Sequence, residues 1–336
     1  MELGRLSTNT TTMSTDEPVP NAIRNFGKPF HAADADIIFR SSDNVDFRAH
    51  RTILIHASPF FASMFALPAP VAGTAGDDRK DGLTVVSMTE DEVTLRHLLC
   101  LCYTALLPSL DTMDELSLTI RLTHKFELGG ATAIAKYRLL ALAVSDPVRA
   151  YALGWILQSK EVVHAAAKES LAKPLLDISA QPEYEHIPAS AILQLLAYHH
   201  RCLRAVPNGS SLLAWAPADS LPAAMLHPHG GNNVNNAGRC SCSSYTSATF
   251  SGGSRNIKHW PLAYLGLAVS DLQRNVRGST VKRFSTLQTT VTSTYLFNCS
   301  NCRAAASAAI ETLSESLATH VEGVITEALD GLQTPF

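Results

Sequence analysis

The sequence is short of charge. Only 17% of its 336 residues are Asp, Glu, Lys or Arg, whereas roughly a quarter is usual for a soluble domain. The formal net charge of −3 leaves no clustered excess of Lys and Arg, which argues against the electrostatic footprint of a nucleic-acid-binding protein. Because so little surface charge leaves apolar surface to be covered, the composition favours a protein partner and no nucleic acid.

Long apolar runs are missing as well. No stretch reaches the ~18 consecutive apolar residues that a membrane-spanning helix needs, so we expect no membrane association. Residues 1–20 are rich in Thr and Ser and lack the apolar centre of a secretory signal peptide. The seven cysteines are odd in number, which is not typical of a disulfide framework. These absences together indicate a reducing compartment, the cytoplasm or the nucleus.

The apolar content, 46% of residues, is enough for a substantial core, and the length suits about two compact domains. Residues 1–30 are polar and aperiodic, which predicts a disordered tail. Residues 31–145 have strand signals first and helix signals after, a pattern typical of the α+β class. We then expect a helical extension at 146–206, a Gly-, Asn- and Ser-rich linker or long loop at 207–256, and a helical C-terminal region at 257–336.

Short strands are expected at the start of the α+β region. Residues 36–40 are mostly apolar, residues 41–44 have turn composition, and the next residues alternate between apolar and polar, which predicts a hairpin with one buried face. Ser58-Pro59 predicts that a second helix starts directly after the first, because serine caps a helix and proline fits its first turn. A third strand is expected at residues 83–88. The alternating residues are Val45, Asp46, Phe47, Arg48, Ala49 and His50.

Helices are predicted to follow. Residues 89–92 and 112–115 have the pattern of capping boxes that open two helices, and we expect Gly129-Gly130 to end the second of them. A further helix is predicted from residue 188 to about 204, and an amphipathic helix over 310–324. The residues expected to face inward on the helix at 188–204 are Ile192, Leu195, Leu196, His199 and Cys202.

Residues 34–65 resemble the signature of the BTB/POZ family, in which a strand pair leads into a helix with spaced Leu, Ser, Phe and Met. Residues 95–103 and 124–128 resemble the helices that follow in the family, and the match covers about a third of the chain. The helical extension, which includes Tyr198-His-His-Arg-Cys202, is similar to BTB proteins abundant in mushroom-forming basidiomycete fungi. The matching residues of the signature are Asp36, Phe47, His50, Leu54, Ser58, Phe61, Met64 and Phe65.

The resemblance implies a domain used for homodimerisation or for docking other proteins, including ubiquitin ligase scaffolds of the cullin-3 type. The chain lacks kelch repeats and a MATH domain, and residues 67–82 lack the hydrophobic-x-Glu step associated with cullin binding. We therefore interpret the protein as a non-catalytic scaffold or adaptor that self-associates and recruits a partner. Two alternatives remain: a substrate adaptor of a cullin-3-type ubiquitin ligase, and a zinc-dependent nucleic-acid-binding transcription regulator.

The resemblance also suggests a partner-binding surface. Asp36 and Arg51 match positions that form a charged pocket near the interface of some BTB dimers, but the simpler interpretation is a strand-end carboxylate and a solvated arginine. His50 is included among the candidate partner-binding residues, and it is expected to help the hairpin pack against the first helix and not to perform proton chemistry. Four large apolar residues within six positions cover more than one helix face, so some of them are expected to face a second subunit. These four residues are Phe60, Phe61, Met64 and Phe65.

Two cysteine pairs suggest a metal. Cys240-Ser-Cys242 lies in a polar stretch, and Cys299-Ser-Asn-Cys302 has a spacing that lets two thiolates bind one ion. Four thiolates would suit a structural Zn²⁺ that joins the loop to the C-terminal helix, and no position would remain open for catalysis. The alternative is that these cysteines bind nothing. The histidines that could substitute as ligands are His227, His229 and His259.

No enzyme motif is found. The sequence has no GxxxxGK[ST], no GxSxG and no HExxH, which are the local signatures of phosphate binding, serine hydrolysis and zinc proteolysis. Pairs of carboxylates occur at 34–36 and 90–92, but a hairpin entry and a helix N-terminus explain both. We therefore expect no catalytic residue and no required cofactor.

Overall fold

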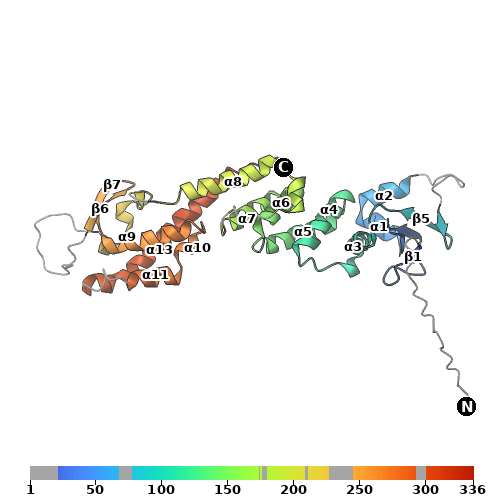
Figure 1. Cartoon of the computed structure of the whole chain (residues 1–336), viewed down its shortest axis with the longest axis horizontal. Helices are drawn as coiled ribbons and strands as arrows, with labels where there is room; N and C mark the ends of the chain where they lie inside the picture. Colours follow the sequence, from blue (N-terminus) through green and yellow to red (C-terminus); the bar gives the residue numbers. More distant parts are fainter. Residues whose placement is uncertain are drawn as a thin grey trace, which may run out of the picture. The chain divides into compact units, whose positions relative to one another are not determined.

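The computed structural model describes residues 22–67, 78–173, 175, 180–208, 211–226, 245–292 and 300–336 (Figure 1). The chain packs into two compact units. The first holds the described residues up to Ser109 together with Arg121–Ala131, and the second holds Leu110–Ile120 and the described residues from Thr132 to Phe336. Among the described residues, no helix has the length and apolar character required to cross a membrane.

A five-stranded sheet forms the centre of the first unit. The strand order is β1-β3-β2-β5-β4. The pairing of the predicted hairpin is confirmed: β2 and β3 are antiparallel, with Phe39 opposite Phe47, and Asn44 at the turn has a φ of 63°, which asparagine tolerates well. The single buried face is not confirmed, because consecutive residues of both strands are buried. The third strand is confirmed as well and pairs in parallel with β2. The strands are β1 (Arg24–Asn25), β2 (Ile37–Arg40), β3 (Val45–Ala49), β4 (Arg79–Lys80) and β5 (Leu83–Ser87).

The end of the predicted disordered tail is ordered. Residues 1–21 lie outside the described residues, but residues 22–30 contain β1, which pairs in parallel with β3. Phe26 stacks on Phe47 with ring centroids 4.5 Å apart, and Phe30 is buried against the same ring. Disorder was therefore the wrong prediction for residues 22–30, because two aromatic side chains in this short segment complete the core of the sheet.

Helices α1 (Arg51–Ala57) and α2 (Pro59–Ala66) follow the hairpin, and the predicted break between them is confirmed. Ser58 caps α2: its Oγ accepts a hydrogen bond from the N–H of Phe61 at 3.2 Å and donates one to the carbonyl of Phe126 at 2.6 Å. One buried hydroxyl therefore fixes both the start of α2 and its attachment to the segment after α4. The further helices are α3 (Glu92–Cys102), the 3-10 turn η1 (Thr104–Leu106), α4 (Met113–Lys125) and α5 (Gly129–Leu142).

Two details of helix ends differ from the prediction. Helix α3 is capped by Asp91, whose carboxylate accepts from the N–H of Thr94 at 2.9 Å, so the box at 89–92 is shifted by two residues. Gly129-Gly130 opens α5 instead of closing α4, which ends at Lys125. The box at 112–115 is confirmed, because Thr112 and Glu115 exchange hydrogen bonds between side chain and backbone, both 3.2 Å long.

The second unit is mainly helical. The last helices of the α+β region share one hydrophobic core with the helices that follow, since Leu116 and Leu139 belong to the same buried cluster as Tyr151 and Val163. Close packing of α6 on α7 depends on Gly154, where a Cβ atom would lie 2.8 Å from Cγ1 of Val162. The elements are α6 (Pro147–Ile156), α7 (Lys160–Ser170), η3 (Pro182–His186), α8 (Ala189–Arg204), η5 (Ala218–Ser220), η6 (Ala223–Met225), β6 (Tyr245–Phe250), β7 (Gly253–Lys258), α9 (His259–Leu272), α10 (Gly278–Val281), α11 (Phe284–Val291) and α13 (Ser300–Asp330).

The stretch predicted as a linker or long loop, 207–256, is partly folded. It contains β6 and most of β7, which form an antiparallel hairpin with Phe250 opposite Gly253. Phe250 and Ile257 are buried in the core of the second unit. The prediction was wrong here because it rested on the Ser- and Gly-rich composition of the stretch. The hairpin is attached to the core by only two apolar side chains, which change that composition very little. Residues 227–244, which include the Gly-Gly-Asn-Asn peak, lie outside the described residues.

Candidate protein-interaction surface

The outer faces of α1 and α2 carry exposed apolar side chains. Ile55 on α1 is 41% exposed, Phe60 on α2 is 37% exposed, and Leu67 at the end of α2 is 70% exposed. Leu67 is the residue at which α2 ends, directly after Ala66. We define Ile55, Phe60 and Leu67, with the half-buried Met64 and Phe65, as the α1–α2 surface.

Phe61 does not belong to that surface. It is fully buried, it stacks on Phe126 at 5.7 Å with an interplanar angle of 13°, and its ring meets Phe39 edge to face. The sequence prediction that Phe61 contacts a partner is therefore replaced by a core role. Two residues that the prediction left out, Ile55 and Leu67, are exposed instead, and helical spacing from the buried Leu54 and Phe61 could have identified them.

The pair Asp36 and Arg51 anchors the start of α1. The backbone N–H of Arg51 donates to Oδ1 of Asp36 at 2.8 Å, so the carboxylate satisfies one of the free N–H groups at the helix N-terminus. The guanidinium carbon of Arg51 lies 5.4 Å from the centroid of the Phe65 ring, a cation–π geometry. Both residues thus hold α1 and α2 in position beneath the α1–α2 surface.

His50 links the hairpin to α3. The hydroxyl of Tyr103 accepts from the backbone N–H of His50 at 2.9 Å and lies 3.0 Å from the Nδ1 atom of the same residue. Tyr103 thereby contacts both the backbone and the ring of His50. Nε2 lies 3.3 Å from Oδ1 of Asp34, and this hydrogen bond lowers the pKa of Asp34. These contacts join His50 to the end of α3 and to Asp34, and not to the first helix as expected.

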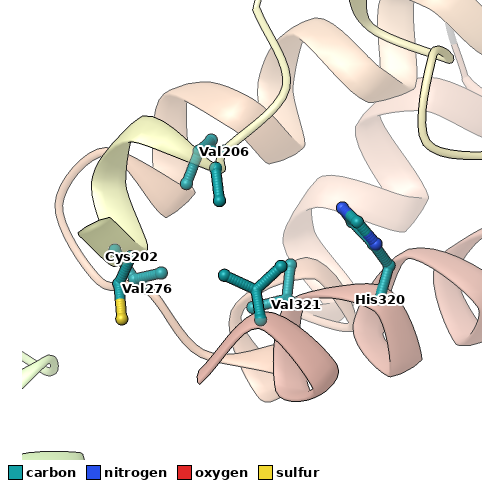
Figure 2. Close-up of a pocket in the computed structure, with 7 residues that line it drawn as sticks. Cys202, Val206, Val276, His320 and Val321 are labelled. Atoms are coloured by element: carbon teal, nitrogen blue, oxygen red, sulfur yellow. The ribbon is translucent and has the colours of Figure 1, made fainter. Parts of the chain in front are cut away.

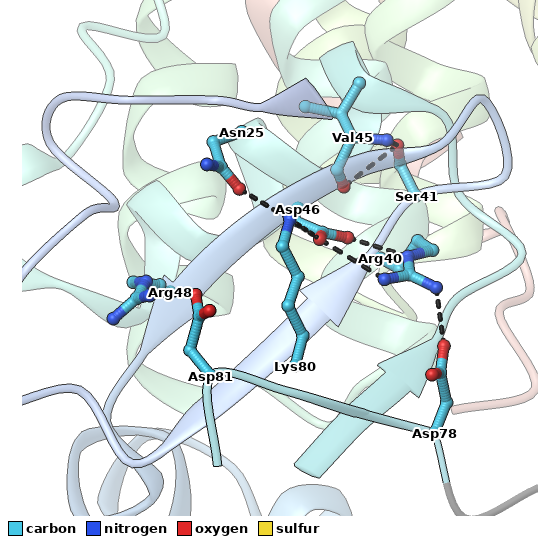
Figure 3. Close-up of polar contacts among 9 residues, drawn as sticks. All are labelled: Asn25, Arg40, Ser41, Val45, Asp46, Arg48, Asp78, Lys80 and Asp81. Atoms are coloured by element: carbon cyan, nitrogen blue, oxygen red, sulfur yellow. Dashed lines mark hydrogen bonds and ion pairs between the residues drawn. The ribbon is translucent and has the colours of Figure 1, made fainter. Parts of the chain in front are cut away.

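A buried carboxylate lies on the sheet (Figure 3). Asp46 on β3 was predicted to face solvent, but it is only 2% exposed. Its Oδ1 atom accepts a hydrogen bond from Nε of Arg40 at 2.7 Å, and its Oδ2 atom accepts one from Nζ of Lys80 at 2.6 Å. Burial raises the pKa of Asp46, but the hydrogen bonds from Arg40 and Lys80 outweigh it, and the net pKa is lowered. Lys80 also donates to Asn25, so the network joins β1, β2, β3 and β4.

The proposed zinc ligands are mostly outside the described residues. Cys240, Cys242 and Cys299 lie there, as do His227 and His229. Cys302 is buried in the first turn of α13, and its sulfur lies 3.6 Å from Nζ of Lys258. Within the described ranges, no three His, Cys, Asp or Glu side chains are grouped as metal ligands. A zinc site therefore stays a prediction.

Two further polar or hollow places lie in the second unit. Ser170 Oγ and His199 Nε2 are 2.7 Å apart, the spacing of a nucleophile and its base, but both residues are buried and Ser170 also donates to the carbonyl of Ala167.

A hollow of about 10 Å³ lies between α8 and α13 (Figure 2), and it has room for about one water molecule. Its labelled lining residues are Cys202, Val206, Val276, His320 and Val321.

Comparison with known families agrees with the geometry of the first unit. Residues 27–140 match the model of the BTB/POZ domain, a range that covers strands β2 to β5, the α1–α2 surface and most of α5 and leaves out β1. No curated protein matches the chain. The chain therefore contains a BTB/POZ domain of the α+β class, followed by a helical extension. Such domains are protein-interaction modules, which gives the chain the general character of a scaffold or adaptor.

Proposed function

Starting from the BTB/POZ domain at residues 27–140, we propose that the chain is a scaffold that pairs with a second copy of itself through the α1–α2 surface. The pair then presents two copies of the helical extension to other proteins. The observation that carries the proposal is the exposure of Ile55, Phe60 and Leu67 on consecutive helices of the domain. Large apolar side chains that gather on one face mark protein interfaces.

Charge on α1 and α2 supports the same role. Arg51 is the only Asp, Glu, Lys or Arg in the two helices, and its guanidinium lies over the Phe65 ring. Depletion of charge with enrichment of Phe and Met is typical of the centre of a protein interface. In a two-fold pair the same face meets itself, and a face with so little charge would bring no carboxylates or lysines together.

The surface is also held rigidly from below. Ser58 fixes α2 through two hydrogen bonds, Asp36 fixes the first turn of α1, and Phe60 contacts the Phe126 ring edge to face at 5.2 Å. Side chains that are ordered before binding lose little entropy on association. The geometry therefore favours a preformed interface over one that folds on contact.

A matched set of substitutions tests the proposal. We expect Phe60→Asp and Ile55→Asp, made in the full chain, to weaken self-association by about tenfold or more, because each introduces a charge into an apolar contact. Val93 on α3 is 66% exposed, and Val93→Asp introduces the same charge on a different helix and serves as the control. Sedimentation velocity over a range of concentrations measures the effect. Equal association of all variants would overturn the proposal.

A further inference from the structure

Helix α8 is apolar on two opposite sides. One side is buried in the core of the second unit and includes Leu195, Tyr198 and Cys202. The other side is exposed: Leu193 is 63% exposed, Leu196 is 43% exposed and Leu203 is 42% exposed. Leu196 was predicted to face inward, and the structure corrects this. The core explains the first side of the helix, but nothing in the described residues covers the second.

The exposed leucines have the spacing of a helix-packing seam. Leu193, Leu196, His200 and Leu203 follow one another at intervals of three, four and three residues, which is the spacing of the a and d positions in a heptad. Such positions form one stripe along a helix. Ala197 lies exposed within the same stripe, and its small side chain permits close approach of a second helix. We call Leu193, Leu196, Ala197, His200 and Leu203 the α8 stripe.

Helix α8 itself carries acid–base charge of one sign. None of the 16 residues of α8 is Asp or Glu, whereas exposed Arg201 and Arg204 flank the stripe near its C-terminal end. Arg201 reaches Gly331 beyond the end of α13, where a Cβ atom would meet its Nη1 atom. Arg204 forms no ion pair within the part of the chain that the structure describes. A second copy of α8 would bring only more positive charge, so charge complementarity requires an acidic partner.

We infer that the α8 stripe is a docking site for an amphipathic α-helix of another protein, one with leucine-type side chains on its apolar face and carboxylates along its edge. The leucines of the partner would pack on Leu193, Leu196 and Leu203, as in helix-in-groove recognition. Its carboxylates would meet Arg204 and Arg201. This site lies on the second unit and does not depend on pairing through the α1–α2 surface, so it would give the scaffold a separate place for a recruited protein.

Synthetic helical peptides provide the test. One probe carries leucines at three- and four-residue intervals with flanking Glu, and a second carries Lys in place of every Glu. We expect the Glu peptide to bind the full chain and the Lys peptide to bind at least about tenfold more weakly, as measured by fluorescence anisotropy. Equal binding of the two peptides, or no binding of either, would overturn the inference.

Substitutions in the full chain locate the contact. Leu196→Asp is expected to weaken binding of the Glu peptide by about tenfold or more. Arg204→Glu is expected to shift the binding preference toward the Lys peptide. Leu267 on α9 is 41% exposed, so Leu267→Asp is the control and should leave binding unchanged. A loss as large in Leu267→Asp as in Leu196→Asp contradicts the assignment. So does a loss of self-association in Leu196→Asp, because the stripe would then contact a second copy.

Discussion

Nε of Arg40 lies 2.7 Å from Oδ1 of Asp46, and the carboxylate that it contacts is 2% exposed. The same carboxylate accepts a hydrogen bond from Nζ of Lys80. Arg40 also forms an ion pair with Asp78, in which Nη1 and Oδ2 are 2.5 Å apart. A buried charge is stable only when it is paired and hydrogen-bonded. Asp46 therefore acts as the common acceptor that joins the central hairpin to the edge strand β4.

Asp46→Asn should destabilise the first unit. Asparagine keeps one acceptor oxygen but turns an NH2 group toward either Arg40 or Lys80 and removes the negative charge that both contact, and breaking a buried pair costs about 3 kcal/mol. Asp78→Asn, at a residue whose side chain is 54% exposed, should cost less than about 1 kcal/mol. Urea unfolding measures both. Equal losses for the two variants would contradict the role given to Asp46.

The contribution of Asp46 should also depend on pH. Its pKa in the folded protein is lowered from an unfolded value near ~3.9. The stabilisation is therefore fully present above about pH 4 and is lost as the pH falls through the lower folded pKa. We expect the stability difference between the wild type and Asp46→Asn to shrink below about pH 4. A difference that stays constant down to the acid transition would argue against an ionised Asp46.

His199 should make the second unit sensitive to mild acid. Burial lowers its pKa to about 4, whereas the unfolded value is near ~6.5, so folding favours the neutral ring. Its stabilisation is complete above about pH 6.5 and falls by up to about 3 kcal/mol as the pH drops toward 4. Thermal unfolding of His199→Gln should show a flatter pH profile in this window. The exposed neighbour supplies the control: His200→Gln should keep the wild-type profile, and a flattening there would refute the assignment.

Glycine substitutions should have opposite signs on two helices. At Gly154 a Cβ atom would lie 2.8 Å from Cγ1 of Val162 and 3.1 Å from the backbone nitrogen of Val163, so Gly154→Ala forces α6 and α7 apart and should cost about 1–3 kcal/mol. At Gly266 on α9 no atom lies within 4 Å of the Cβ position, and Gly266→Ala should stabilise by about 0.5–1 kcal/mol. Chemical denaturation gives both values, and a stabilising Gly154→Ala would disprove the close packing.

Asp36 should matter as a hydrogen-bond acceptor more than as a charge. Its Oδ1 atom accepts the N–H of Arg51 at the start of α1. Asp36→Ala removes the acceptor and should cost about 1 kcal/mol, while Asp36→Asn keeps an oxygen there and should lose less than half of that. Thermal unfolding compares the two variants. If both lose equally, the carboxylate acts through its charge, and the pocket suggested by the family resemblance regains support.

Much of the first unit could be predicted because its signals are local. The hairpin follows from alternation over a few residues, and the start of α2 follows from Ser58-Pro59. The burial of Asp46 could not be predicted, because Lys80 and Asn25 come from strands that only the fold brings together.

The interaction surfaces divide in the same way. Helical spacing predicts that the large apolar residues of the α1–α2 region cover more than one helix face, so that some of them are exposed. Only the structure shows that Phe61 is buried in the core and that Ile55 is exposed. On α8, periodicity predicts an amphipathic helix but cannot decide which of two apolar sides is buried, so Leu196 was assigned to the wrong one. The hairpin at β6 and β7 was missed because its strands are mostly polar and only Phe250 and Ile257 anchor it.

The central claim is that two chains pair through the α1–α2 surface, and the most direct measurement is the mass of the full chain in solution. Light scattering at micromolar concentration should give twice the mass of one chain, and the same measurement on Phe60→Asp should give the mass of one. A wild-type mass equal to one chain at every concentration tested would contradict the account.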